Sequence, residues 1–186
     1  MLLLFAAAFI LIRTATFSTA GRPAEPAKPI PLEPRQAAMH LAQAIRCETV
    51  STARGKPNRQ ALLDMHRFLE LSYPLVHQRL ERTQIAEYSL VYRWPGAQPE
   101  LDPILLMAHL DVVPVDPATL PAWTYPPFDG AIEDGFVWGR GALDMKNQLV
   151  AIFEAVEHLL AAGYQPSRDV YISCGHDEEI GGIDGS

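Results

Sequence analysis

The feature that most limits the fold of this chain is a long amphipathic helix predicted between two short apolar strands. In residues 149–160 apolar side chains recur on one helical face, and Gly163 stands where a C-terminal helix cap is typical. The flanking residues 104–108 and 169–174 have the length and apolar content of buried strands. Such a crossover joins parallel strands in a right-handed sense, so we expect an α/β fold: a three-layer, mostly parallel sheet with flanking helices.

Other segments extend this layered pattern. Residues 38–45 and 62–69 carry apolar positions at helical spacing, and the second helix should end before Pro74. Residues 88–94 have the β-branched and aromatic content of a further strand. A tight hairpin is predicted around Asp134-Gly135, over a sheet edge or a pocket.

The N-terminal residues differ from the rest of the chain. Residues 2–12 form an unbroken apolar run that is short for a membrane span but suits a signal-peptide core, and small residues follow at 18–20. We therefore expect a signal peptide or an N-terminal anchor over residues 1–20, a proline-rich linker over 21–34 and a folded domain over 35–186. This organisation predicts an exported protein: periplasmic, secreted or tethered to a membrane.

Composition excludes two kinds of site. The net charge is −7, from 22 acidic against 15 basic residues, and no Lys/Arg cluster is present that could neutralise phosphates, so no nucleic acid partner is expected. Cys47 and Cys174 lie outside any CxxC or Cys/His spacing, which argues against a thiolate zinc site. Each is expected to be a buried, small apolar residue.

Polar residues gather where the predicted strands end, which is where open α/β sheets bind ligands. His109 and Asp111 follow the strand 104–108 and, at a spacing of two, should project to the same side. One can then bind a metal while the other orients it. A capped turn is the alternative, because aspartate commonly serves turns.

Two further acidic positions follow the same logic. Asp144 lies in a glycine-rich turn just before the long helix, where it could instead be only a helix N-cap. The acids at 177–179 follow the strand 169–174, where a solvated acidic turn is the alternative. Carboxylate and imidazole ligands without thiolate suit zinc at a hydrolytic centre, with manganese or cobalt as substitutes.

Taken in order, these motifs resemble those of the zinc metallopeptidase superfamily of carboxypeptidase S, aminoacylase and acetylornithine deacetylase. The matching stretches, over roughly residues 35–186, are MAHLDVVP at 107–114, Trp123 with PPFDG at 126–130, GRGALDMKN at 139–147 and GHDEEIGG at 175–182. The similarity is greatest to the subgroup of carboxypeptidase S and the secreted N-acyl-amino-acid hydrolases.

The resemblance implies a role for each matching residue around two zinc ions. Metal ligands would be His109 on one ion, Asp144 as the bridge and Glu179 on the other. Asp111 would orient His109, and Glu178 would be the general base. The family motif assigns no such role to His176.

The implied activity is metal-dependent hydrolysis of the amide bond of a small peptide or an N-acyl amino acid. The alternatives are a biosynthetic deacylase, of the acetylornithine or succinyl-diaminopimelate kind, and an inactive metal-binding remnant. Family members carry further ligands and a smaller domain, often dimer-forming, at positions that would follow Ser186. We therefore expect an N-terminal fragment of a catalytic domain, inactive and poorly stable alone, whose complete form is an active hydrolase and can be a homodimer.

Overall fold

The computed structural model describes residues 2–17, 32–54 and 56–185. The chain divides into two compact units, Met1–Pro31 and Leu32–Ser186. The first unit contains helix α1 (Leu2–Ala15), which covers the predicted apolar run. Residues 18–31, with the small residues and most of the predicted linker, lie outside the described residues. In the described ranges, no helix is both long and apolar enough to cross a membrane.

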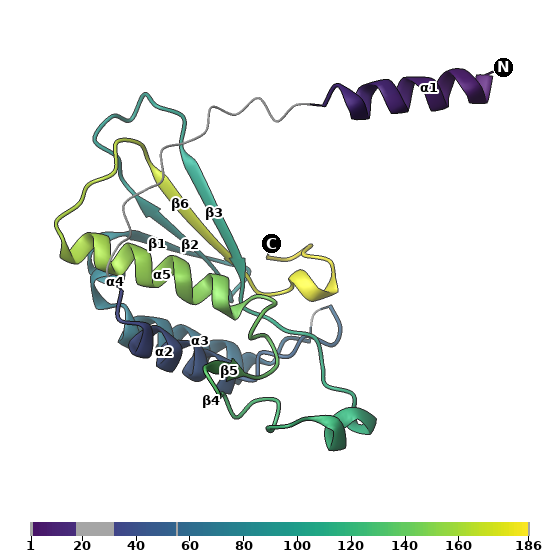
Figure 1. Cartoon of the computed structure of the whole chain (residues 1–186). Helices are drawn as coiled ribbons and strands as arrows, with labels where there is room; N and C mark the ends of the chain where they lie inside the picture. The colour runs from purple at the N-terminus through teal and green to yellow at the C-terminus, as the bar shows by residue number, and fades with distance from the viewer. Residues whose placement is uncertain (1, 18–31, 55, 186) are drawn as a thin grey trace. The chain divides into compact units, whose positions relative to one another are not determined.

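The second unit is built on a four-stranded sheet in the order β1-β2-β6-β3 (Figure 1). Its strands are β1 (Glu81–Ile85), β2 (Ser89–Trp94), β3 (Ile104–His109) and β6 (Val170–Gly175). Helix α5 (Lys146–Ala161) connects β3 to β6, and these two strands are parallel, as the crossover pattern predicts. Gly163 follows α5 with φ of +72°, a conformation that favours glycine at a helix end.

The expectation of a mostly parallel sheet is corrected by the pairing of the other strands. β1 pairs antiparallel with β2, and β2 pairs antiparallel with β6. The cause lies in the connection: the short turn between β1 and β2, in which Ala86 and Glu87 have positive φ, leaves room only for an antiparallel hairpin. A parallel pair needs a longer crossover connection, which α5 provides between β3 and β6.

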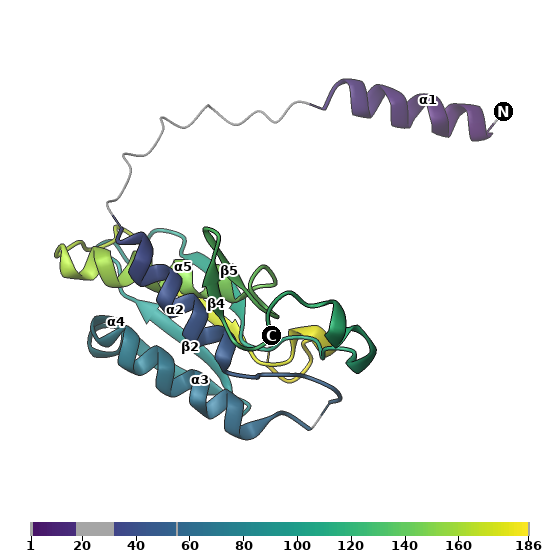
Figure 2. The same ribbon diagram turned by 60° about the horizontal axis from the view of Figure 1, so that its bottom comes forward.

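Helices cover one face of the sheet in this unit, as Figures 1 and 2 show. They are α2 (Pro34–Arg46), α3 (Arg59–Ser72), α4 (Pro74–Arg79) and α5. Leu90, Tyr92 and Phe153 are 0% exposed in the core between these layers. On the opposite face, Leu105 and Met107 are 56% and 53% exposed. The α/β layering with flanking helices is confirmed, but the described part has two layers instead of three.

A small hairpin stands apart from the main sheet. β4 (Ala131–Glu133) and β5 (Phe136–Trp138) pair antiparallel around Asp134-Gly135, where both residues have positive φ, as the tight-turn pattern predicts. The hairpin packs against α2. The remaining elements are the short 3-10 helices η1 (Pro117–Ala122) and η2 (Glu178–Ile180).

Candidate metal centre

The candidate centre lies at the edge of the sheet where the parallel strands β3 and β6 end. His109 is the last residue of β3 and is in register with Gly175, the last residue of β6. Beyond this pair, the backbone N–H of Leu110 donates to the Gly175 carbonyl at 2.6 Å. The register therefore brings the segment after β3 and the acidic turn after β6 to one place, as expected for a sheet edge that binds ligands.

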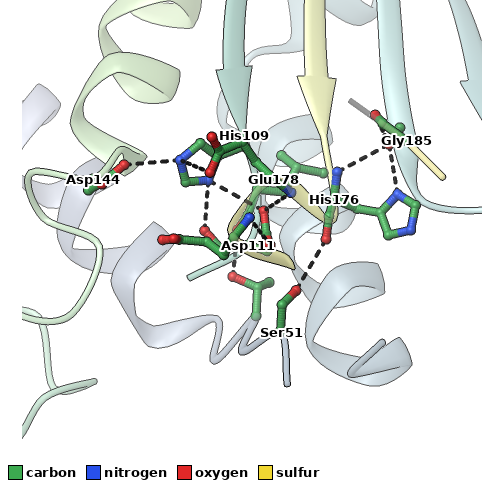
Figure 3. A network of polar contacts seen from close by, with 11 residues as sticks. Ser51, His109, Asp111, Asp144, His176, Glu178 and Gly185 are labelled. Carbon is green, nitrogen blue, oxygen red and sulfur yellow. Dashed lines mark hydrogen bonds and ion pairs between the residues drawn. The ribbon is translucent and has the colours of Figure 1, made fainter. Parts of the chain in front are cut away.

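His109 is held in one orientation by the residue two positions ahead. Its Nδ1 lies 3.0 Å from the Asp111 carbonyl oxygen and 3.4 Å from Asp111 Oδ1. Its Nε2 faces the other way, 3.0 Å from Asp144 Oδ1 and 3.8 Å from Glu178 Oε2 (Figure 3). With Nδ1–H donating to the carbonyl, Nε2 is the ring nitrogen turned toward the carboxylates, which is the arrangement a metal-binding histidine needs.

Asp111 contacts more than His109. Its Oδ1 accepts the backbone N–H of Glu178 at 3.1 Å, and its Oδ2 accepts that of Glu179 at 3.2 Å. Asp111 is 0% exposed, so this carboxylate has no solvent to satisfy it. A single buried side chain therefore ties the imidazole at the end of β3 to the acidic turn after β6. The capped-turn alternative is thus partly right, because the turn that Asp111 caps is η2.

Asp144 lies in the loop that leads into α5. Gly141 precedes it with φ of +81°, and a Cβ atom there would lie 2.6 Å from a methyl carbon of Val112, so the loop needs glycine at this position. The Asp144-Met145 peptide bond is cis. The N-cap residue of α5 is Met145, without a side-chain cap bond. Asp144 is therefore not the cap of α5, and its carboxylate, 79% exposed, turns toward His109.

The acidic turn divides its residues between different environments. Asp177 is 4% exposed, and its Oδ2 accepts the backbone N–H of Asp184 at 2.8 Å, whereas the side chain of Glu178 is 55% exposed. Glu179 joins His109 and Asp144 in a group whose ligand atoms all lie within 4.8 Å of one another. These are the three residues for which the resemblance implies metal ligation. The turn is thus not simply a solvated acidic surface.

The local charges alter the proton affinities of these groups. Burial disfavours the imidazolium of His109, but the hydrogen bonds that it donates to Asp111 and Asp144 outweigh this effect and raise its pKa to about 9. Burial also disfavours ionised Asp111, yet the bonds from His109, Ser51 and the Glu179 amide lower the pKa of that carboxyl. The pKa of Glu179 is raised, chiefly by burial. Neighbouring carboxylates therefore account for the raised pKa of His109, hydrogen-bond donors for the lowered pKa of Asp111, and burial for most of the shift at Glu179.

His176 lies outside the group. Its Nδ1 is 2.7 Å from Ser89 Oγ on β2, its ring packs edge-on to Tyr88, and in Figure 3 it points away from His109 toward Gly185. The structure thus agrees with a motif that assigns this histidine no ligand role. It belongs to the contacts that hold β6 and β2 together at the strand end.

Lys146 is a supporting residue whose role the sequence did not reveal. It is 0% exposed, and its Nζ donates to the carbonyls of Ala44 at 2.8 Å and Cys47 at 2.6 Å, at the end of α2. Burial lowers its pKa to about 8. The bonds join the start of α5, two residues after Asp144, to α2. Lys146 lies in the stretch GRGALDMKN, but no spacing pattern predicts which carbonyls it meets.

Comparisons with known proteins show which proteins the chain is similar to. Residues 105–186 match the profile of Peptidase family M20/M25/M40. Carboxypeptidase S of Saccharomyces cerevisiae is 46% identical over 125 residues, 66% of this chain and 22% of that protein. The N-fatty-acyl-amino acid synthase/hydrolase PM20D1 of Mus musculus is 41% identical over 148 residues, 78% of this chain and 29% of that protein.

A solved structure has the same fold. The M20 family metallo-carboxypeptidase Sso-CP2 from Sulfolobus solfataricus superposes with a TM-score of 0.63 at 23% identity, over 80% of this chain and 32% of that one. The chain therefore spans less than a third of the length of the relatives described here.

Proposed function

Because residues 105–186 match peptidase family M20/M25/M40, we propose that the protein uses bound zinc to hydrolyse the amide bond of a small peptide or an N-acyl amino acid. One observation carries this proposal: His109, Asp144 and Glu179 offer ligand atoms within 4.8 Å of one another. The names of two relatives point to the same substrate classes, since one is a carboxypeptidase and the other an N-fatty-acyl-amino acid synthase/hydrolase.

The donor set fits zinc. One imidazole nitrogen and carboxylate oxygens converge, and His109 turns Nε2 toward them because Asp111 engages Nδ1. Such ligands suit zinc in catalytic sites, and cobalt or manganese can substitute. His109, Asp144 and Glu179 would hold the metal, with Asp144 as the bridge if two ions bind, as the resemblance implies. When bound, zinc supplies Lewis acidity toward a carbonyl oxygen and a water molecule.

Glu178 is the proposed general base. Its side chain is 55% exposed and its Oε2 lies 3.8 Å from His109 Nε2, so the carboxylate is beside the ligands and reachable by substrate. It accepts a proton from the water that attacks the amide carbonyl carbon. When the C–N bond breaks, Glu178 returns that proton to the leaving nitrogen, which yields an amine and a carboxylic acid; the acid then releases the second proton of the water to solvent and becomes a carboxylate.

Asp111 serves as a positioning residue for both functions. It orients His109 through Nδ1 and holds the backbone of Glu178 and Glu179 through its two carboxylate oxygens. The ligand and the base thus share one buried anchor, which fixes their separation before any ligand arrives.

Removal and return of metal test the proposal. Protein from its own source should release amino acids from blocked dipeptides and N-acyl glycines, lose that activity in a chelator and regain it with zinc. Activity that survives complete metal removal would contradict the proposal. Stoichiometric zinc binding without turnover on any substrate would support the metal-binding remnant instead, and a preference for N-acetylornithine or N-succinyl-diaminopimelate would support the biosynthetic deacylase.

We further propose that the protein is exported. In helix α1 the apolar side chains of Phe5, Phe9 and Leu11 are 72%, 65% and 69% exposed, which is the pattern of a signal-peptide core or a membrane anchor. Fractionation of the source cells, with the mass of the N-terminal peptide, tests this. Loss of the first residues would indicate a cleaved signal and retention a tether, whereas intact protein confined to the cytosol would contradict export.

A further inference from the structure

A hollow of about 670 Å³ opens beside the candidate metal centre, and it has a different chemical character from the centre itself. Asp144 and Glu179 line it on one side. The other side, here called the aromatic wall, is lined by Val113, Trp123, Phe136, Trp138, Arg140 and Leu143. The wall therefore adjoins two of the three residues that would hold metal. The volume of the hollow is in the range typical of small-molecule sites.

The wall presents large apolar side chains to solvent. Leu143, which directly precedes Asp144, is 86% exposed, and Phe136 and Trp138 on strand β5 are 65% and 36% exposed. Leaving such side chains in water is unfavourable, and contiguous exposed apolar surface usually marks a binding site. Burial of these side chains by a ligand would be a favourable contribution to binding.

The aromatic rings of the wall are already held in place. The Trp138 indole N–H donates to the Glu133 carbonyl at 3.1 Å. The centroid of the Trp138 ring lies 5.5 Å from that of the Tyr125 ring and 5.9 Å from that of the Phe136 ring. The guanidinium of Arg140 lies over the Trp123 ring, 5.6 Å from its centroid. Rings fixed by such contacts lose little freedom when a ligand arrives.

We propose that the aromatic wall is a subsite for a large apolar group, aromatic or branched aliphatic, next to the scissile amide of the substrate. This inference rests on the proposed function, because it places the amide carbonyl at the ligand group. A carbonyl near Asp144 and Glu179 has its neighbouring substituent within reach of Leu143 and the hairpin rings. The Arg140 charge is directed to Trp123, so the surface offered to that substituent is mainly apolar.

Two hydroxamates that differ only in their apolar group test the subsite. Acetohydroxamate and phenylacetohydroxamate carry the same metal-binding head, and both would be titrated into the zinc-loaded full chain. Two of the three tryptophans, Trp123 and Trp138, line the wall, so intrinsic fluorescence reports binding there. We expect phenylacetohydroxamate to bind about tenfold more tightly, in line with burial of one phenyl group.

Matched variants locate the preference. Leu143→Ala and Phe136→Ala should reduce the preference for phenylacetohydroxamate severalfold while leaving acetohydroxamate affinity unchanged. Leu71→Ala is the control, because Leu71 is an equally apolar residue, 71% exposed, on α3 outside the wall. Circular dichroism confirms that each variant is folded.

The outcomes separate this inference from the proposed function. Equal affinity for the two hydroxamates, binding of neither, or a preference that survives both wall substitutions would overturn the subsite. If the wall variants instead change only the oligomeric state, the wall is a protein interface and the subsite is likewise overturned. A phenyl preference that depends on Leu143 and Phe136 would uphold the subsite even if zinc-loaded protein hydrolyses no amide, a result that counts against the proposed function alone.

Discussion

The candidate metal centre is buried on one side and exposed on the other. On the buried side, His109 and Asp111 are 4% and 0% exposed, and the neighbouring Leu110 and Val112 are also 0% exposed. On the exposed side, the side chains of Asp144 and Glu178 are 79% and 55% exposed. We expect the buried residues to fix the positions of the ligand side chains, and the exposed residues to contact metal, water and substrate. Substitutions on the two sides should therefore change different quantities.

The largest effect is expected on the exposed side. Glu178→Gln keeps the shape of the side chain but removes its proton acceptor, so turnover should fall by about a thousandfold. Zinc stoichiometry and the free energy of unfolding should stay unchanged, because Glu178 has little burial to lose. Steady-state kinetics with metal analysis measures this, and Asp184→Asn is a matched control in the same segment. Turnover that persists in Glu178→Gln would mean that the base is another residue.

Asp144→Ala tests the exposed ligand. Zinc affinity should fall by more than about a hundredfold, because one of the three proposed ligands is lost. The free energy of unfolding of metal-free protein should change by less than about 0.5 kcal/mol, since the side chain is solvated. Competition with a zinc-binding dye and urea denaturation report the two quantities. A large loss of stability would show that the exposed side also supports the fold.

Asp111→Ala tests the buried side, where stability and metal binding should fall together. The amides of Glu178 and Glu179 lose their acceptors, and the His109 ring loses the nearby carboxylate while keeping the Asp111 carbonyl, so unfolding should become easier by about 3 kcal/mol. Zinc affinity should fall by about tenfold to a hundredfold. Asp111→Asn, which keeps one acceptor oxygen, should be intermediate in urea denaturation. Unchanged stability in both variants would contradict the buried anchor.

The smallest effect is expected at His66, a histidine whose pKa is shifted by burial and not by a paired carboxylate. His66 is 5% exposed and its Nε2 lies 2.8 Å from the Tyr88 carbonyl, but no carboxylate pairs with it there, and burial lowers its pKa below 6.5. His109, beside carboxylates, has its pKa raised to about 9. Folded protein therefore keeps His66 neutral where the unfolded chain takes up a proton.

The lowered pKa of His66 predicts the direction in which the free energy of unfolding changes with pH. The stability contributed by neutral His66 is complete above pH 6.5 and is lost as the pH falls below that value. From pH 7 to pH 5 the free energy of unfolding should decrease more in the wild-type protein than in His66→Gln, whose amide can still donate to Tyr88. Equal decreases in urea denaturation would show that His66 does not contribute to acid sensitivity.

Much of the fold was predictable because its signals are local. The apolar periodicity of residues 149–160 predicted α5, and the apolar strands on either side of it are β3 and β6. β1, with the sequence ERTQI and every residue exposed, was missed because it carries no apolar alternation. Its position follows from pairing with β2, and that pairing also makes the sheet mixed. The family resemblance noted from four motifs is confirmed by the match over residues 105–186.

The sequence by itself determined which side chains could form the centre, because imidazole and carboxylate groups at strand ends are recognisable from type and spacing. Only the tertiary structure decided how they meet. His109 contacts Asp144 across 35 positions, and Asp111 holds the Glu178 amide across 67. Such contacts depend on the register of β3 against β6 and on the packing of α5, which no local pattern encodes. The Lys146 anchor and the aromatic wall arise for the same reason.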